Sequence, residues 1–101
     1  MKEMQNIIPL NSIVVPRLKV SKIRDDYYAV LIPAAFNEYV VDKSFIIYLK
    51  TKSGIIPLGP KKVSRLNNKN HCIFLPKNFN ETWQTLHGKK ESVDVILTTV
   101  G

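Results

Sequence analysis

The chain has 101 residues, a hydrophobic fraction of 45% and a formal net charge of +7 at pH 7. This length suits one domain with one core and is too short for two independent domains. A disulfide-stabilised fold is excluded because Cys72 is the single cysteine. A helix that crosses a membrane is also excluded, since no apolar run reaches the roughly 18–20 residues that such a helix needs.

The positive charge is concentrated in one part of the chain. Between residues 43 and 80 lysine and arginine recur without a single Asp or Glu. A solvated surface usually mixes both signs over such a length, and a basic domain attracts polyanions, of which nucleic acid is the commonest. The charge pattern therefore predicts a working electropositive surface in this region.

The N-terminal residues 1–16 are predicted to form an irregular arm or an edge strand, because Pro9 and Pro16 interrupt short apolar pieces. The domain itself is expected over residues 17–101. The first residues lack the uninterrupted apolar core of a signal peptide, so we expect a soluble intracellular protein. Residues 17–20 alternate charged and apolar side chains, as a strand with one wet face does. Residues 21–26 read as a polar connection, and residues 27–32 as a central strand.

One sequence pattern occurs twice. Residues 33–38 read Pro-Ala-Ala-Phe-Asn-Glu and residues 76–81 read Pro-Lys-Asn-Phe-Asn-Glu, each after an apolar run. Proline is favoured at the start of a helix, where its missing N–H would be unpaired anyway. Each copy is therefore predicted to be a strand that enters a short helix, at residues 34–39 and 77–86, with Phe36 and Phe79 packing that helix against a sheet.

A hairpin is predicted between the two copies. In residues 45–50, Phe45, Ile47 and Leu49 share one face of a strand. Gly54 supplies a turn residue that accepts positive φ, and residues 55–58 return as an edge strand that tolerates Pro57. Residues 59–70 follow as a loop, either a flexible soluble hairpin tip or a basic arm that touches phosphates with lysine and base edges with Arg or Asn.

The last third of the chain repeats the strand and helix. Residues 71–75 are predicted as a strand that buries Cys72, and Trp83 and Leu86 fall at helical spacing on the core side of the second helix. Gly88 is expected to end this helix in the left-handed conformation. Residues 93–97 alternate apolar and other side chains as a final strand.

Catalysis is not expected from this sequence. His71 and His87 have no plausible nucleophile beside them, acidic residues are few, and the chain has no glycine-rich phosphate loop. With Cys72 they do not make a four-ligand zinc set. We therefore expect no enzyme activity, metal, cofactor or small-molecule substrate.

The order of these elements resembles the plant B3 DNA-binding domain, especially its divergent reproductive-meristem type. The residues that carry the resemblance lie at 31–39, 45–54, 73–79 and 93–97. The resemblance implies a mainly β fold with two short α-helices, arranged as an open seven-stranded β-barrel of the DNA-binding pseudobarrel type. The leucine-proline-lysine step at residues 75–77 and the repeat also resemble the AbrB-type swapped-hairpin DNA-binding domain, in which the two halves would form a pseudo-dimer within one chain.

Both resemblances imply binding of double-stranded DNA. On the B3 pattern the protein would be a nuclear transcription regulator that reads the major groove with two arms, the connection at residues 20–27 and the loop at residues 61–70; without that resemblance a cytoplasmic location is expected. The implied DNA-binding residues are Lys22, Arg24, Lys61, Lys62, Arg65, Asn67, Asn68, Lys69 and Lys77. The alternative is a protein-interaction or structural β-barrel module without DNA binding, which could pair through the open edge at residues 55–58. No membrane partner is expected, and the sequence does not define an oligomeric state.

Overall fold

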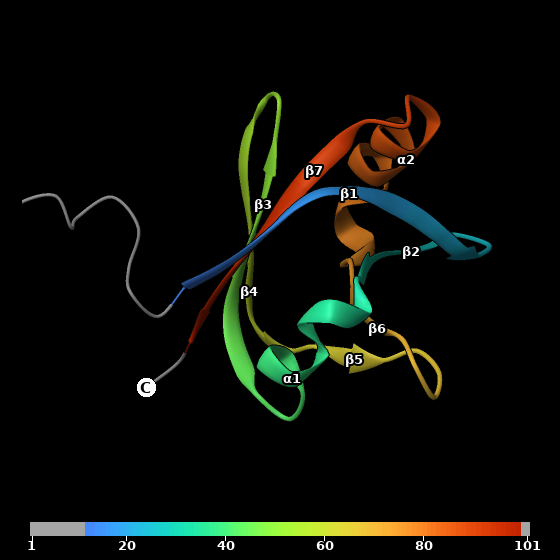
Figure 1. The fold of residues 1–101 in the computed structure, drawn as a ribbon. Coiled ribbons are helices and arrows are strands. Elements are labelled where there is room, and N and C mark those ends of the chain that lie inside the picture. The colour runs from blue at the N-terminus through green and yellow to red at the C-terminus, as the bar shows by residue number, and fades with distance from the viewer. Residues whose placement is uncertain (1–11, 100–101) are drawn as a thin grey trace, which may run out of the picture.

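The computed structural model describes residues 12–99, which form one curled sheet with short helices beside it (Figure 1). The strands are β1 Ser12–Arg24, β2 Tyr27–Ile32, β3 Ser44–Thr51, β4 Gly54–Lys62, β5 Ser64–Arg65, β6 His71–Phe74 and β7 Ser92–Thr99. The helices are η2 Ala34–Phe36, α1 Asn37–Val40, η3 Lys77–Phe79 and α2 Asn80–Gly88. With 57% strand and two short helices, the predicted mainly β class is confirmed.

The seven strands make an antiparallel half-barrel in the order β4-β3-β7-β1-β2-β6-β5. The long strand β1 pairs with β7 along its first part and with β2 along its last part. Strands β4 and β5 lie at opposite ends of the order, yet Val63 alone separates them in the chain. The sheet therefore has to curl, and the predicted seven-stranded open barrel is confirmed.

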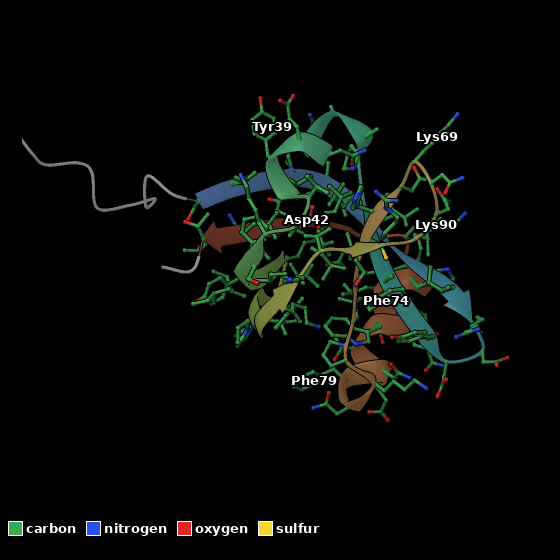
Figure 2. All side chains as sticks on the ribbon, turned by 90° about the horizontal axis from the view of Figure 1, so that it is seen from below. Tyr39, Asp42, Lys69, Phe74, Phe79 and Lys90 are labelled. Atoms are coloured by element: carbon green, nitrogen blue, oxygen red, sulfur yellow. The ribbon has the colours of Figure 1, made fainter. Side chains whose placement is uncertain are left out.

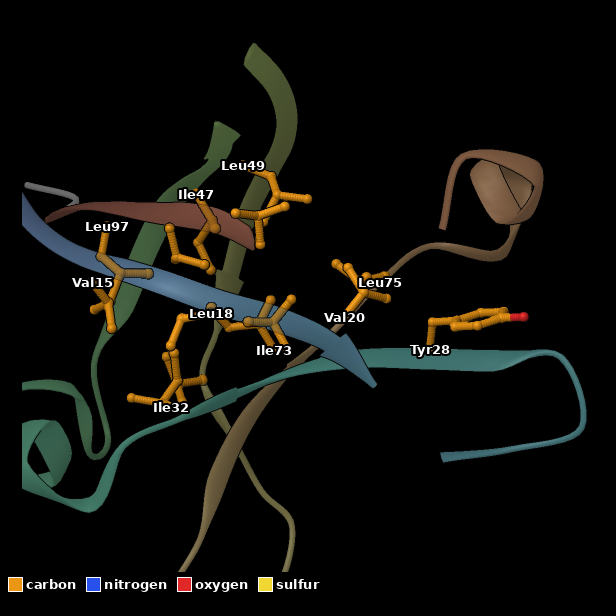
Figure 3. Packing of buried hydrophobic residues seen from close by; sticks show 14 of the residues in the cluster. Val15, Leu18, Val20, Tyr28, Ile32, Ile47, Leu49, Ile73, Leu75 and Leu97 are labelled. Atoms are coloured by element: carbon orange, nitrogen blue, oxygen red, sulfur yellow. The ribbon is translucent and has the colours of Figure 1, made fainter. Parts of the chain in front are cut away.

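The core fills the inside of this curl (Figure 3). The alternation predicted for β3 is confirmed, because Phe45, Ile47 and Leu49 are all fully buried. In α2 the side chain of Trp83 is fully buried as predicted, and its Nε1 donates a hydrogen bond of 2.7 Å to the Pro76 carbonyl oxygen.

The two phenylalanines of the repeat pack differently. Phe36 lies partly buried against the core, as predicted. The same prediction for Phe79 is wrong, because this side chain is 44% exposed; its ring lies edge-on to the Trp83 ring, at 6.1 Å between centroids. The larger Trp83 already fills the space between α2 and the sheet, so Phe79 is left at its margin.

The repeated pattern is the visible part of a longer duplication. Pro33 and Pro76 are 43 positions apart, and the same shift turns Val30 into Ile73. Val30 and Ile73 are paired with each other in the β2–β6 ladder. The pairs on either side of them are Ala29 with Phe74 and Leu31 with Cys72. An antiparallel pair in which a residue faces its own copy has local twofold symmetry. Strands β2 and β6 are therefore related by an approximate twofold axis.

The second ladder obeys the same symmetry. In β3 and β7 the shift is 48 positions, from Phe45 to Val93, because α2 has nine residues where α1 has four. Tyr48 then faces its own copy, Ile96, across the β3–β7 pair. The left-handed residue before each strand recurs as well, Asp42 with φ 58° and Lys90 with φ 53°. Lys90 rather than Gly88 takes the left-handed conformation, so that prediction was wrong.

The outer strands complete the two halves. The pairing of Ser44 with Lys62 corresponds to the pairing of Ser92 with Lys19, and the buried Val63 corresponds to Val20, which is also buried. Strand β1 thus matches β4 and β5 taken together. The described chain consists of two copies of one strand-strand-helix-strand unit, wound around an approximate twofold axis.

Residues 12–16 of the predicted arm or edge strand belong to β1 and pair there with β7 alone, as an edge strand does, while residues 1–11 lie outside the described part of the chain. Two other predicted boundaries were wrong. The connection predicted at 21–26 is strand as far as Arg24. The loop predicted at 59–70 is strand through Lys62 and again in β5. The edge strand predicted at residues 55–58 is present but continues through Pro60, because a strand at the end of the sheet needs ladder hydrogen bonds on one side only. None of the helices within residues 12–99 is long and apolar enough to span a bilayer.

Candidate nucleic-acid interface

Two hairpins project from the same side of the molecule, at the right of Figure 1. The first hairpin, residues 22–28, joins the end of β1 to β2, and the second hairpin, residues 65–71, joins β5 to β6. The 43-residue shift maps one onto the other, with Lys22 matching Arg65. The two arms predicted from the sequence are therefore twofold-related copies of one structure.

In the first hairpin the basic side chains come from the end of a strand. Lys22 lies opposite Tyr28 and Arg24 lies opposite Tyr27, and both basic side chains are exposed. Asp25 and Asp26 form the turn, and Asp25 has a positive φ of 42°. Because Lys22 and Arg24 lie in a strand, their backbone positions are fixed by strand pairing. A polar loop would not fix them in this way.

In the second hairpin Arg65 lies opposite His71, and Lys69 projects from the tip (Figure 2). The Asn67 side-chain oxygen accepts hydrogen bonds from the backbone N–H groups of Lys69 and Asn70, each 3.0 Å long. Asn67 thus holds the turn in place. Asn68 and Lys69 lie at the tip and are exposed, as are the flanking Asn67 and Asn70.

A matching pair of asparagines holds the two tips. Asn37 donates to the backbone carbonyl of Lys69 at 3.2 Å, and Asn80 donates to the backbone carbonyl of Asp26 at 2.6 Å. Donors and acceptors are both 43 positions apart, so each half of the molecule anchors the hairpin of the other half. Asn37 also contacts the Nδ1 atom of the buried His71 at 3.1 Å.

Replacing either asparagine by alanine is expected to destabilise the fold. Asn80→Ala should lower the free energy of unfolding by about 1 kcal/mol, and Asn37→Ala by about 2 kcal/mol, because the latter also leaves a buried imidazole without its partner. Urea unfolding measures both values. A larger loss of unfolding free energy in Asn80→Ala than in Asn37→Ala would contradict this prediction.

The other predicted site residues lie apart from the second tip. Lys62 is exposed on β4 opposite Ser44, and Lys77 is exposed in η3. Lys61 is half-buried, and its Nζ donates a 3.0 Å hydrogen bond to the Phe74 carbonyl oxygen. Burial lowers the pKa of Lys61, because desolvation disfavours the ammonium form. The expected single arm at 61–70 is therefore divided between a sheet edge and a hairpin tip.

The two hairpins differ in charge although they match in structure. The first carries Lys22 and Arg24 together with Asp25 and Asp26, so its charges cancel. The second carries Arg65 and Lys69 and no acid, which leaves two positive charges. Lys77 lies 3.6 Å from the Asp26 carboxylate.

Sequence reasoning missed Tyr27, which lies in the first hairpin, and Phe74, which ends β6 beside it. Their rings stack with centroids 4.9 Å apart and planes 9° from parallel, and the Lys77 Nζ lies 5.3 Å from the centre of the Tyr27 ring. Strand alternation could have suggested Tyr27, because one of the adjacent Tyr27 and Tyr28 has to face outward.

Metal-binding side chains are not clustered in the described region. Among residues 12–99 no three His, Cys, Asp or Glu side chains are placed to hold a metal ion. Cys72 is fully buried as predicted, and desolvation raises the pKa of its thiol. Comparisons with protein-family models, with curated proteins and with solved structures gave no match for this chain.

Proposed function

We propose that the protein binds double-stranded DNA through the two hairpins. The observation that carries this proposal is the pair of exposed hairpins, related by an approximate twofold axis and projecting from one side of a protein with a net charge of +7. The backbones of the two antiparallel DNA strands are themselves related by local twofold axes, and DNA-binding proteins commonly align their own twofold with the operator's. Two equivalent hairpins can therefore meet two equivalent backbone segments.

Each hairpin offers two kinds of contact. Lys22 and Lys69 are flexible point charges suited to phosphates, which supply most of the affinity but no sequence information. Arg24 and Arg65 can form bidentate hydrogen bonds with guanine, and Asn68 can do so with adenine, in the major groove. The resemblance to the B3 domain implies that a protein with this arrangement is a transcription regulator that recognises a DNA sequence.

The alternative, pairing of a partner strand with the sheet edge, has weaker support. Strand β4 does lie at one end of the sheet and Ile55 is 58% exposed on it. Pro57 and Pro60 in the same strand have no backbone N–H to donate, which limits the strand addition that an open edge invites. Salt-insensitive self-association in sizing chromatography would favour this alternative over DNA binding.

The test of the proposal is fluorescence anisotropy with a labelled random-sequence duplex at several salt concentrations. Four hairpin cations that each displace about one counterion predict a log–log salt slope of up to about −3.6. Absence of binding at low salt would refute the proposal. A selection of bound sequences from a random duplex pool then separates specific from general binding.

Removing the charge of the second hairpin is expected to weaken this binding. Arg65→Gln with Lys69→Gln should make the salt slope shallower by about two and reduce the affinity about tenfold or more at low salt. The matched control is Lys50→Gln with Lys52→Gln, an equal charge change at the β3–β4 hairpin, which lies away from the proposed surface. Equal losses in both variants would show that net charge, and not the hairpin, determines binding.

A further inference from the structure

A surface pocket of about 470 Å³ lies at the base of the first hairpin. We call it the Tyr27 pocket. Its lining comes from the first hairpin, from β4, and from the connection between β6 and η3, and comprises Arg24, Asp25, Asp26, Tyr27, Lys61, Phe74, Leu75, Pro76 and Lys77. Three of these residues, Arg24, Lys61 and Lys77, are basic, and two, Asp25 and Asp26, are acidic.

The other half of the molecule provides an internal comparison for this pocket. Shifting by 43 positions replaces Tyr27 by Asn70, Phe74 by Leu31 and Lys77 by Ala34. Lys61 is matched by Leu18, a buried core residue. Residues that support the fold are similar in the two halves, as Pro76 and Pro33 are. The aromatic pair and its surrounding cations occur in one half alone, so the shared fold does not account for them.

The two aromatic rings of the pocket stack on each other. Tyr27 and Phe74 are both half-buried and lie nearly parallel, with Lys77 close to the Tyr27 ring. Aromatic side chains in a basic groove are the usual platform for an unpaired base, since every base has a π-face. A duplex offers no free base face along its length, so the platform has no use in contacts with paired DNA.

The cations of the pocket are the groups that a phosphate would bind. Lys61 reaches across to the Phe74 backbone carbonyl, and its desolvated ammonium gains a strong partner when an anion enters. Lys77 pairs with Asp26 at 3.6 Å while their side chains are 61% and 67% exposed, so this ion pair is weak and can be exchanged for a phosphate.

We propose that the Tyr27 pocket binds an unpaired nucleotide, with the base against the Tyr27–Phe74 stack and the phosphate between Lys61, Lys77 and Arg24. The nucleotide can be free in solution or can belong to a strand end or an unpaired position in DNA. In the second case the inference rests on the proposed function and deepens it. The protein would then hold DNA with its hairpins and capture an unpaired base beside the first of them.

The experiment uses two variants chosen by the internal comparison. Phe74→Leu introduces the side chain that the other half carries at Leu31, in an equivalent strand, so the fold should tolerate it. The control, Leu31→Phe, makes the opposite change in the other half. Thermal unfolding establishes that both variants are folded.

Binding is measured with deoxyadenosine monophosphate by following backbone amide NMR shifts, and with deoxyribose 5-phosphate as a ligand without a base. We expect the nucleotide to shift amides around Tyr27 and Phe74 and the sugar phosphate to bind more weakly. Phe74→Leu should weaken nucleotide binding roughly tenfold, as loss of one base–aromatic stack does, and Leu31→Phe should leave it unchanged. Nucleotide shifts located elsewhere, or equal affinity in Phe74→Leu and the parent protein, would overturn the proposal.

A second comparison sets a matched duplex against the same duplex with one unpaired adenine. Preference for the unpaired base, lost in Phe74→Leu, supports capture from DNA. If the nucleotide binds and neither duplex does, the pocket is a site for free nucleotides and the proposed function is refuted. Binding of both duplexes equally, with no nucleotide shifts at the pocket, leaves the hairpin proposal standing and refutes this one.

Discussion

Replacing Trp83 by alanine is expected to lower the free energy of unfolding by about 3–5 kcal/mol, the usual cost of removing a large buried aromatic side chain. Trp83 is the largest fully buried side chain, and it joins α2 to the sheet while its Nε1 satisfies the Pro76 carbonyl. Domains of this size have a total stability of roughly 5–15 kcal/mol. The substitution therefore removes much of the stability, and urea unfolding followed by circular dichroism measures the loss.

Two further variants separate the contributions of Trp83. Trp83→Phe keeps a ring in the core but loses the hydrogen bond, and should cost about 1–3 kcal/mol, less than alanine. Gln84→Ala changes the exposed neighbour on the same helix and should stay within about 0.5 kcal/mol of the parent. A loss below about 1 kcal/mol in Trp83→Ala would mean that α2 does not depend on this contact.

The sequence predicted the scaffold well where one physical signal dominated. Alternating side chains placed β3 and β7, apolar runs placed β2 and β6, the turn at Gly54 placed β4, and the proline that precedes each helix placed both helices. The predictions at residues 21–26 and 59–70 were wrong, because charged side chains and prolines were read as loop. Strand pairing at the end of a sheet tolerates both, and which strand lies at the end is a property of the whole sheet.

Most of the duplication was invisible in the sequence. The two halves share Pro, Phe, Asn and Glu in one short pattern, but Leu18 matches Lys61 and Tyr27 matches Asn70. Only the strand registers, in which Val30 faces Ile73 and Tyr48 faces Ile96, reveal how far it extends.

The residues of the candidate site were named from the sequence, but their arrangement in space was not predicted. Lys22, Arg24, Arg65 and Lys69 do lie on two hairpins, whereas Lys61 is half-buried elsewhere. Burial and stacking depend on which strands become neighbours, so neither the desolvation of Lys61 nor the Tyr27–Phe74 stack could be derived from local sequence. The difference in charge between the two hairpins can be interpreted only once the hairpins are known to be structurally equivalent.

Giving the first hairpin the charges of the second is expected to strengthen DNA binding. Asp25 and Asp26 occupy the positions of Asn68 and Lys69, so Asp25→Asn with Asp26→Lys makes the two tips alike and adds three positive charges. The backbone carbonyl that accepts the Asn80 hydrogen bond is retained. Loss of repulsion and one added phosphate contact should raise the affinity about tenfold or more at low salt and steepen the salt slope by about one.

The reciprocal exchange separates the effect of charge at the hairpins from the effect of the overall net charge on DNA affinity. Asn68→Asp with Lys69→Asp gives the second hairpin an acid pair and should weaken binding by a similar factor. Combining all four substitutions restores the parent net charge of +7 while transferring the charge between the tips. If the twofold axis of the protein meets a twofold axis of the duplex, the combined variant should recover most of the affinity for random DNA, because either hairpin can take either strand. Affinity that stays low in the combined variant would show that the second hairpin has a role which the first cannot assume, and would contradict symmetric engagement of the duplex.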